Sequence, residues 1–136
     1  MIEQISILIE NRQGTLAEVT KALAGAGVSL KAFSINDTSD FGILRIIVDD
    51  VEKAGQALGK EGFGYTISEV VAIELEDKAG ALNSLLEALK DTYNVNYIYS
   101  MVLRTEGLPL LIISIDPKEG VEDFLRGKGF EVYDME

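Results

Sequence analysis

Two short segments carry the residue types best suited to holding a small anion. Asn11-Arg12-Gln13-Gly14-Thr15-Leu16 recurs later in the chain as Asp77-Lys78-Ala79-Gly80-Ala81-Leu82. Each segment follows an apolar run and precedes apolar residues at helical spacing, which predicts a strand-to-helix turn. The glycine lets the backbone approach whatever lies above it. The first N–H groups of a helix have no partner inside it and lie at its positive end, so each turn is a candidate anion site.

The residues that are missing narrow the other possibilities. The sequence of 136 residues contains no histidine and no cysteine. This excludes disulfides, thiol catalysis, zinc–thiolate sites and the commonest metal ligand. The remaining carboxylates, tyrosines and lysines are not spaced so that the fold would direct a carboxylate pair and a nucleophile into one pocket. We therefore expect no catalytic residue, no metal and no cofactor.

The charge balance argues against two classes of partner. Lys and Arg number 12 against 23 Asp and Glu, which gives a net charge of -11. Such a chain repels phosphate backbones and anionic lipid surfaces, so nucleic acid and membrane are not expected as partners. No segment reaches the roughly 18 apolar residues that span a bilayer, and the first residues lack the basic region of a signal peptide. We expect a cytoplasmic protein.

The repeated turns belong to a repeated order of elements, which predicts two small domains, residues 1–68 and 69–136. Ser68-Glu69 is the only candidate joint between them. Hydrophobic periodicity and turn residues predict the elements as follows. In the first copy, strands are expected at 4–10, 28–36, 43–48 and 63–68, and helices at 15–24 and 51–60. In the second, strands are expected at 70–76, 95–104, 108–115 and after Gly129-Phe130, and helices at 80–90 and from Asp116-Pro117 onward.

This order predicts an α+β fold made of two ferredoxin-like βαββαβ sandwiches with antiparallel sheets. Right-handed crossovers place both helices of a unit on one face of its sheet. Residues 43–48 and 110–115 are almost continuously apolar, so the face without helices also needs a cover. We expect that cover to be another sheet, from the sister domain or from a second copy of the chain. The protein is therefore predicted to be at least a homodimer.

Both halves resemble ACT domains. The likeness rests on a strand at residues 5–10, then Asn11-x-x-Gly14-Thr15-Leu16, then the segment 24–30, and residues 70–134 resemble a second domain. Together they cover essentially the whole chain. ACT domains are regulatory modules that typically bind an amino acid or another small metabolite at an interface between two such domains. The resemblance implies a non-catalytic sensor of a free amino acid.

A zwitterionic amino acid needs donors for its carboxylate and acceptors for its ammonium group. The N–H groups of either turn suit the carboxylate. The resemblance implies that the acceptors come from Asn11 or Asp77 and from the second strand of a neighbouring domain. Tyr97 and Tyr99 favour a flat or cyclic side chain such as that of histidine or phenylalanine. The predicted ligand-binding residues are Asn11, Gln13, Gly14, Thr15, Leu16, Ser29, Ser34, Asn36, Asp77, Ala79, Gly80, Ala81, Leu82, Tyr97, Tyr99 and Met101.

Each of these residues also has a purely structural interpretation. The glycines can serve close packing of helix against strand, Asn11 and Asp77 can cap their turns, and the tyrosines can pack in an interface. Thr15 is replaced by Ala81 in the second copy, so one of the turns can be structural only. The leading hypothesis is a sensor that regulates a partner through ligand-linked quaternary change. The alternative is a regulatory or structural subunit of an enzyme of amino-acid metabolism that acts through protein contacts without a ligand of its own.

Overall fold

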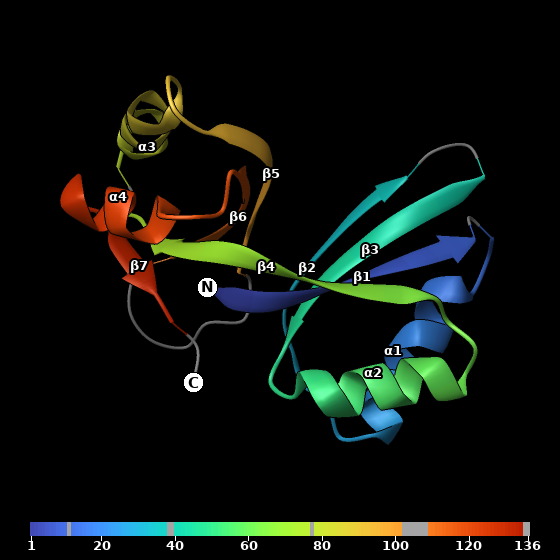
Figure 1. Ribbon diagram of the computed structural model, residues 1–136. Helices are drawn as coiled ribbons and strands as arrows, with labels where there is room; N and C mark the ends of the chain where they lie inside the picture. The colour runs from blue at the N-terminus through green and yellow to red at the C-terminus, as the bar shows by residue number, and fades with distance from the viewer. Residues whose placement is uncertain (11, 38–39, 77, 102–108, 135–136) are drawn as a thin grey trace. The chain divides into compact units, whose positions relative to one another are not determined.

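The computed structural model describes residues 1–10, 12–37, 40–76, 78–101 and 109–134. By its contacts the chain divides into two compact units. One contains Glu3–Ser68, and the other contains Glu69–Glu136 together with Met1–Ile2 (Figure 1).

The first unit is a four-stranded antiparallel sheet with two helices. Its strands follow the order β2-β3-β1-β4, so that β2 is an edge strand. Register pairs Ile7 of β1 with Leu44 of β3, and Ile35 of β2 with the same Leu44. The N–H of Leu8 donates to the carbonyl of Gly64, just before β4, at 3.3 Å. The elements are β1 (Ile2–Glu10), α1 (Thr15–Gly25), β2 (Leu30–Asp37), β3 (Phe41–Val48), α2 (Val51–Lys60) and β4 (Tyr65–Glu74).

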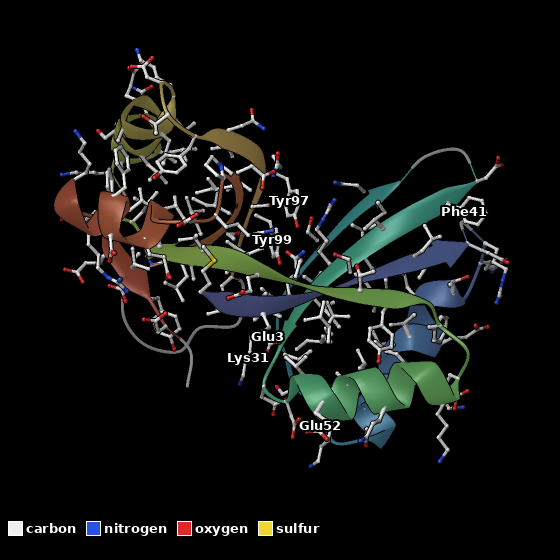
Figure 2. The ribbon with its side chains drawn as sticks, viewed as in Figure 1. Glu3, Lys31, Phe41, Glu52, Tyr97 and Tyr99 are labelled. Carbon is white, nitrogen blue, oxygen red and sulfur yellow. The ribbon has the colours of Figure 1, made fainter. Side chains whose placement is uncertain are left out.

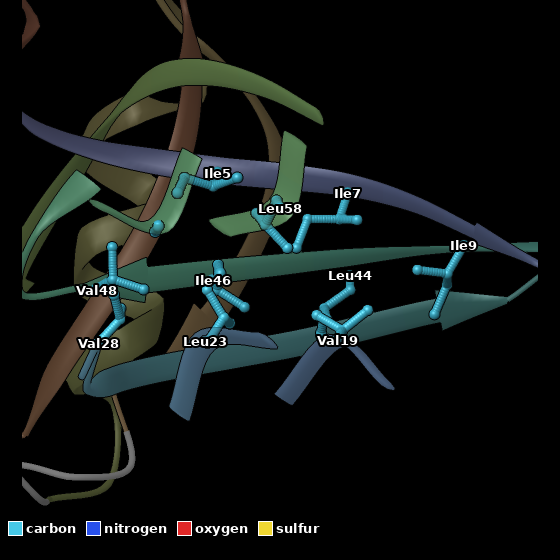
Figure 3. Packing of buried hydrophobic residues seen from close by; sticks show 11 residues of the cluster. Ile5, Ile7, Ile9, Val19, Leu23, Val28, Leu44, Ile46, Val48 and Leu58 are labelled. Atoms are coloured by element: carbon cyan, nitrogen blue, oxygen red, sulfur yellow. The ribbon is translucent and has the colours of Figure 1, made fainter. Parts of the chain in front are cut away.

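Alternation in the strands and helical spacing in α1 and α2 build the core of this unit. Because side chains alternate along a strand, β1 and β3 each direct every second residue to the same face, where both helices pack. The side chain of Asp50 caps α2 by accepting from the Lys53 N–H at 3.1 Å. The buried cluster, shown in Figure 3, contains Ile5, Ile7, Ile9, Val19, Leu23, Val28, Leu44, Ile46, Val48, Ala54 and Leu58.

The second unit repeats this architecture. Its strand order is β7-β4-β6-β5, with antiparallel pairing throughout. Its further elements are α3 (Ala81–Leu89), β5 (Asn94–Ser100), β6 (Leu110–Asp116), α4 (Val121–Gly127) and β7 (Glu131–Tyr133). Its buried cluster contains Val71, Ile73, Leu85, Leu89, Ile113, Ile115, Val121 and Leu125. The predicted fold class, two ferredoxin-like βαββαβ units with antiparallel sheets, is confirmed.

Three details differ from the prediction. The strands expected at 63–68 and 70–76 are one strand, β4, so the expected joint at Ser68-Glu69 lies inside a strand. The last helix begins at Val121, not at Asp116-Pro117, because Asp116 is the final residue of β6 and pairs with Asn94. The expected strand 95–104 ends at Ser100 within the described part of the chain.

The described residues contain neither a membrane-spanning helix nor a metal-binding group of acidic residues. None of the helices found there has the length and apolar character needed to cross a bilayer. The same residues contain no group of three or more carboxylates that could hold a metal ion.

Candidate functional site

The turn before α1 is a type II turn that requires glycine. The Thr15 N–H donates to the Arg12 carbonyl at 3.4 Å, and Gly14 between them has φ 88° and ψ -9°. No described non-glycine residue, Gln13 included, has positive φ, which matches the type II geometry with glycine in its third position. A Cβ on Gly14 would meet nothing within 4 Å. The backbone conformation, and not close packing of helix against strand, is therefore what demands glycine.

The turn before α3 has the same geometry. The Ala81 N–H donates to the Lys78 carbonyl at 3.3 Å, and Gly80 has φ 88° and ψ -8°. A third turn of this kind precedes α4, where Gly120 has φ 76°. The sequence reasoning missed it, although a glycine directly before an apolar helical run was a usable signal. Type II turns are thus this chain's usual way of entering a helix, and a ligand is not needed to explain them.

Both main turns leave backbone donors open. The carbonyl of Gly14 accepts from the Glu18 N–H at 3.0 Å, and this is the first helical bond of α1. No acceptor among the described residues lies against the N–H groups of Leu16 or of Ala17 after it. In α3 the first helical bond is from the Ser84 N–H to the Gly80 carbonyl, at 2.9 Å. The N–H groups of Leu82 and of the residue after it likewise have no acceptor among the described residues. Each helix therefore presents two N–H groups at its positive end.

Charge distinguishes the two turns. Beside the first, Arg12 donates to the Glu10 carboxylate at 3.2 Å and to both Glu18 oxygens at 3.2 and 3.1 Å. The hydrogen bonds that Arg12 donates to Glu18, and then the charge of Glu18, raise the pKa of the Arg12 guanidinium. Glu18 lies in the first turn of α1, where it already provides the negative charge that the helix dipole favours. The first turn of α3 carries no acidic residue, because Ser84 takes that place. Of the two helices, α1 therefore has a carboxylate in its first turn and α3 has none.

Thr15 and its neighbours divide into turn-forming and exposed residues. The Thr15 hydroxyl is buried and donates to the Arg12 carbonyl at 3.1 Å, so it closes the turn. Ala81 cannot make this bond. Around the two turns the exposed residues of the predicted set are Gln13, Gly14, Leu16, Ala79, Gly80 and Leu82.

Two predicted residues, Asn36 and Ser29, lie near opposite ends of β2, with Ser29 directly before its first residue. Asn36 lies at the end of β2 near the Gly14 turn. Its neighbour Asp37 pairs with Gly42 of β3, and the adjacent Phe41 pairs with the last residue of β1, directly before that turn. With its amide oriented to satisfy both neighbours, the Asn36 oxygen accepts from Arg45 at 2.8 Å. Ser29 lies at the opposite end, where its N–H donates to the Asp49 carboxylate at 2.9 Å.

A bulge decides which residues of β2 face the helices. The register shifts between Leu30 and Ala32, after which Phe33 and Ile35 pair with core residues of β3. Ser34 pairs with Arg45 and therefore lies, like Asn36, on the face without helices. Phe33 and Ile35 are 48% and 42% exposed on the helix side of this edge strand. They were not among the predicted site residues, although the two-sided apolar pattern of the strand was a signal.

A bulge acts in the same way on the tyrosines of β5. After a register shift between Val95 and Tyr97, Tyr97 pairs with Ser114 and Tyr99 with Ile112, on the face without helices. Their ring centroids lie 6.4 Å apart, with an angle of 16° between the ring planes. Both side chains are labelled in Figure 2. Within this unit they therefore do not face the Gly80 turn. Met101 does lie at that end of the sheet, where its N–H donates to the Leu110 carbonyl at 2.9 Å. Asn11 and Asp77 lie outside the described residues.

Comparison with known proteins identifies the family. A family model described as an ACT domain pair matches residues 1–130. The chain belongs to the ACT domain family. No curated protein sequence matches it.

Solved structures share this fold. Protein BT0572 from Bacteroides thetaiotaomicron is 33% identical, with a TM-score of 0.89 over 97% of this chain and 91% of that one. The ligand-free regulatory subunit of aspartate kinase from Thermus thermophilus is 21% identical, with a TM-score of 0.66 over 91% and 87%. E. coli aspartokinase III in complex with lysine and aspartate is 17% identical, with a TM-score of 0.53 over 92% of this chain and 29% of that one. At these identities the last two show the ACT fold alone.

Proposed function

We propose that the chain is a non-catalytic sensor that binds a free amino acid at a glycine turn and regulates a partner through a ligand-linked quaternary change. The observation that carries this proposal is that two N–H groups at the positive end of α1, and two at that of α3, have no acceptor among the described residues, in a chain of the ACT family. The carboxylate of the amino acid accepts from these groups. A second ACT domain completes the site, and occupancy shifts the assembly by its differential affinity for two arrangements.

We assign the stronger carboxylate site to the second turn. The N–H groups of Leu82 and Asn83 face no acidic side chain from the first turn of α3, and nearby Lys78 pairs with Glu76 at 2.9 Å. In the first turn Glu18 competes for the same positive end. A charge at a helix N-terminus is worth roughly 0.3–1 kcal/mol at an exposed position, and Arg12, which pairs with Glu18 at 3.1 Å, reduces this difference between the two turns.

The ammonium group and side chain of the ligand are assigned from the family pattern. Asp77 supplies the acceptor for the ammonium group. Tyr97 and Tyr99 lie on the sheet face opposite the helices of their own unit, so they do not contact a ligand held by the turn of that unit. They favour a flat or cyclic amino acid only if the ligand is held by the turn of another domain. The regulated partner is an enzyme of amino-acid metabolism.

A thermal-shift screen of the free amino acids tests this proposal. A ligand at a hundred times its dissociation constant stabilises the folded chain by about 2.7 kcal/mol, which raises Tm by several degrees. The matched variants are Ser84→Glu, which restores the carboxylate found in the first turn, and Ser84→Gln, which does not. We expect Ser84→Glu to weaken binding about two- to fivefold at low salt and Ser84→Gln to leave it unchanged. No stabilisation by any amino acid at millimolar concentration would refute the sensor.

The alternative is a regulatory or structural subunit that acts through protein contacts alone. One observation favours it: the same turn occurs at Gly120, before a helix of only seven residues for which no ligand is expected. Under this alternative no amino acid raises Tm in the thermal-shift screen. An enzyme of amino-acid metabolism co-purifies with the chain whether or not an amino acid is present.

A further inference from the structure

A groove lies between α1 and α2 of the first unit. Its volume is about 660 Å³. Small residues form much of it, and a Cβ added at Gly25 would meet nothing within 4 Å, which shows open space above the end of α1. The lining residues are Glu18, Lys21, Ala22, Gly25, Ala26, Lys53, Gln56, Ala57, Lys60, Glu61 and Phe63.

The groove is basic although the chain is acidic. Lys21 of α1 and Lys53 and Lys60 of α2 line it, and in the described parts of the chain none of the three forms an ion pair. Of the two carboxylates in the lining, Glu18 is held by Arg12 at 3.1 Å. Three lysines without an ion pair among the described residues outnumber the two lining carboxylates, Glu18 and Glu61, so the groove is locally positive in a chain of net charge -11.

The second unit provides an internal comparison. In the repeat, Ala57 corresponds to Phe124, and Tyr93 follows α3 where the first copy has Ala26 and Gly27. The rings of Tyr93 and Phe124 lie 5.0 Å apart, and both pack against the core of the second unit. The charge is also more negative in the second copy, since Lys21 corresponds to Glu87 and the neutral Gln56 to Asp123. The open, basic groove is therefore a property of the first copy and not of the fold.

We propose that this groove docks an acidic amphipathic helix of a partner protein. Ala22, Gly25 and Ala57 let a third helix approach closely, and Phe63 offers it an apolar contact. Lys53 and Lys60 are two helical turns apart, about 10 Å, which matches acidic residues at the same spacing on the partner. A small molecule fits less well, because small-molecule sites need fixed, convergent polar groups and these lysines end in flexible chains. Among the described residues, every buried side-chain polar atom already has a hydrogen-bond partner, so none is left to serve as such a fixed group.

This proposal goes beyond the amino-acid sensor, since it concerns another surface and needs no amino acid. It is tested without added amino acid on the whole chain. The probe is an end-capped, fluorescein-labelled peptide of about 18 residues, with leucine and alanine on one helical face and glutamate on the other. A second peptide with lysine in place of glutamate serves as the charge control. Fluorescence anisotropy measures affinity.

Two variants alter the groove, and a third is their matched control. Ala57→Phe fills the groove as Phe124 does in the second copy, and we expect it to weaken binding of the acidic peptide at least about tenfold. Lys53→Glu, which is exposed and does not touch the core, is expected to weaken binding about fivefold or more. Lys31→Glu makes the same charge change outside the groove and is expected to change affinity less than about twofold. The lysine peptide is expected not to bind.

Three results would overturn the proposal. One is no binding of the acidic peptide at millimolar concentration. Another is equal affinity of the Lys53→Glu and Lys31→Glu variants. A third is that Lys53→Glu changes the mass of the protein in sedimentation, since a second copy of the chain would then be the occupant. A failed amino-acid screen leaves this proposal standing, and a failed peptide titration leaves the sensor standing.

Discussion

Gly14 and Gly80 share one backbone conformation although their neighbours differ. In the first turn the Thr15 hydroxyl adds a bond to the Arg12 carbonyl, whereas Ala81 adds none in the second. Both glycines nevertheless have φ of 88° with open space where a Cβ would be. The constraint therefore belongs to the type II turn itself, and the N-cap glycine of each helix has no side chain that could accept from the N–H groups after it.

Substitution of Gly14 tests this constraint. We expect Gly14→Ala to lower the free energy of unfolding by about 1–2 kcal/mol, the cost of a left-handed conformation for an L-residue. The control is Gly25→Ala, where φ is not positive and space is equally open, so that no loss is expected and a gain of up to about 1 kcal/mol is possible. Urea denaturation followed by circular dichroism measures both. Equal midpoints for the two variants would show that backbone strain does not set the requirement for glycine.

At the level of elements, β4 is the main departure from the expected architecture. It runs without interruption from Tyr65 to Glu74, so its first residues belong to one unit and its last to the other. The stretch contains no glycine or proline to end a strand, and Val70 to Ile73 are apolar and buried. A boundary drawn from the repeat therefore falls within a continuous strand.

Proline substitution distinguishes a strand from a linker at this position. Glu69→Pro fixes φ and removes an N–H inside β4, and we expect a loss of about 1–3 kcal/mol in the free energy of unfolding. Glu119→Pro is the control, because Glu119 is the second residue of the turn that ends at Gly120 and Val121, a position where proline is favoured. Urea midpoints should fall for Glu69→Pro only. If both variants unfold like the parent chain, residues 68–69 behave as a loop.

Periodicity was sufficient for most elements and failed where distant pairing decided the outcome. The expected helix at 51–60 has the bounds of α2, because Asp50 supplies a cap that is local in sequence. Asp116-Pro117 has the residue types of a helix start, but Asp116 pairs with Asn94 and its carboxylate accepts from the Asn96 amide at 2.8 Å, which extends β6 instead. Only the folded sheet reveals that bond.

The candidate site shows the same division. The glycine turns were predictable because the geometry of a type II turn depends on only four consecutive residues. The facing of Tyr97 was not predictable, because it depends on a bulge after Val95, and one extra residue moves all that follow to the other face. The groove between α1 and α2 was also missed, since small residues on a helix surface give no periodic signal.

At the scale of the whole molecule, the two sheet edges differ in chemistry. The edge strand β5 carries Asn94 and Asn96, whose amides are engaged by neighbouring oxygens. The edge strand β2 instead exposes Phe33 and Ile35 on its helix side. An exposed apolar edge strand is a template for pairing with another strand. Because a chain of net charge -11 repels its own copies, apolar contact at this edge has to supply the attraction for a dimer.

We therefore expect the homodimer to form through β2. Light scattering at micromolar concentration should show at least twice the 14.8 kDa mass of one chain. Phe33→Glu should reduce the particle to a single chain, because it buries a charge at the new contact. Leu8→Glu is the matched control: Leu8 is 59% exposed but lies on β1, opposite Ile43, on the face without helices. If Leu8→Glu dissociates the dimer and Phe33→Glu does not, the sheet face and not the edge joins the copies. If light scattering shows a mass of 14.8 kDa for the parent chain, the homodimer does not form. A second copy of the chain then cannot supply the neighbouring domain that the amino-acid site requires.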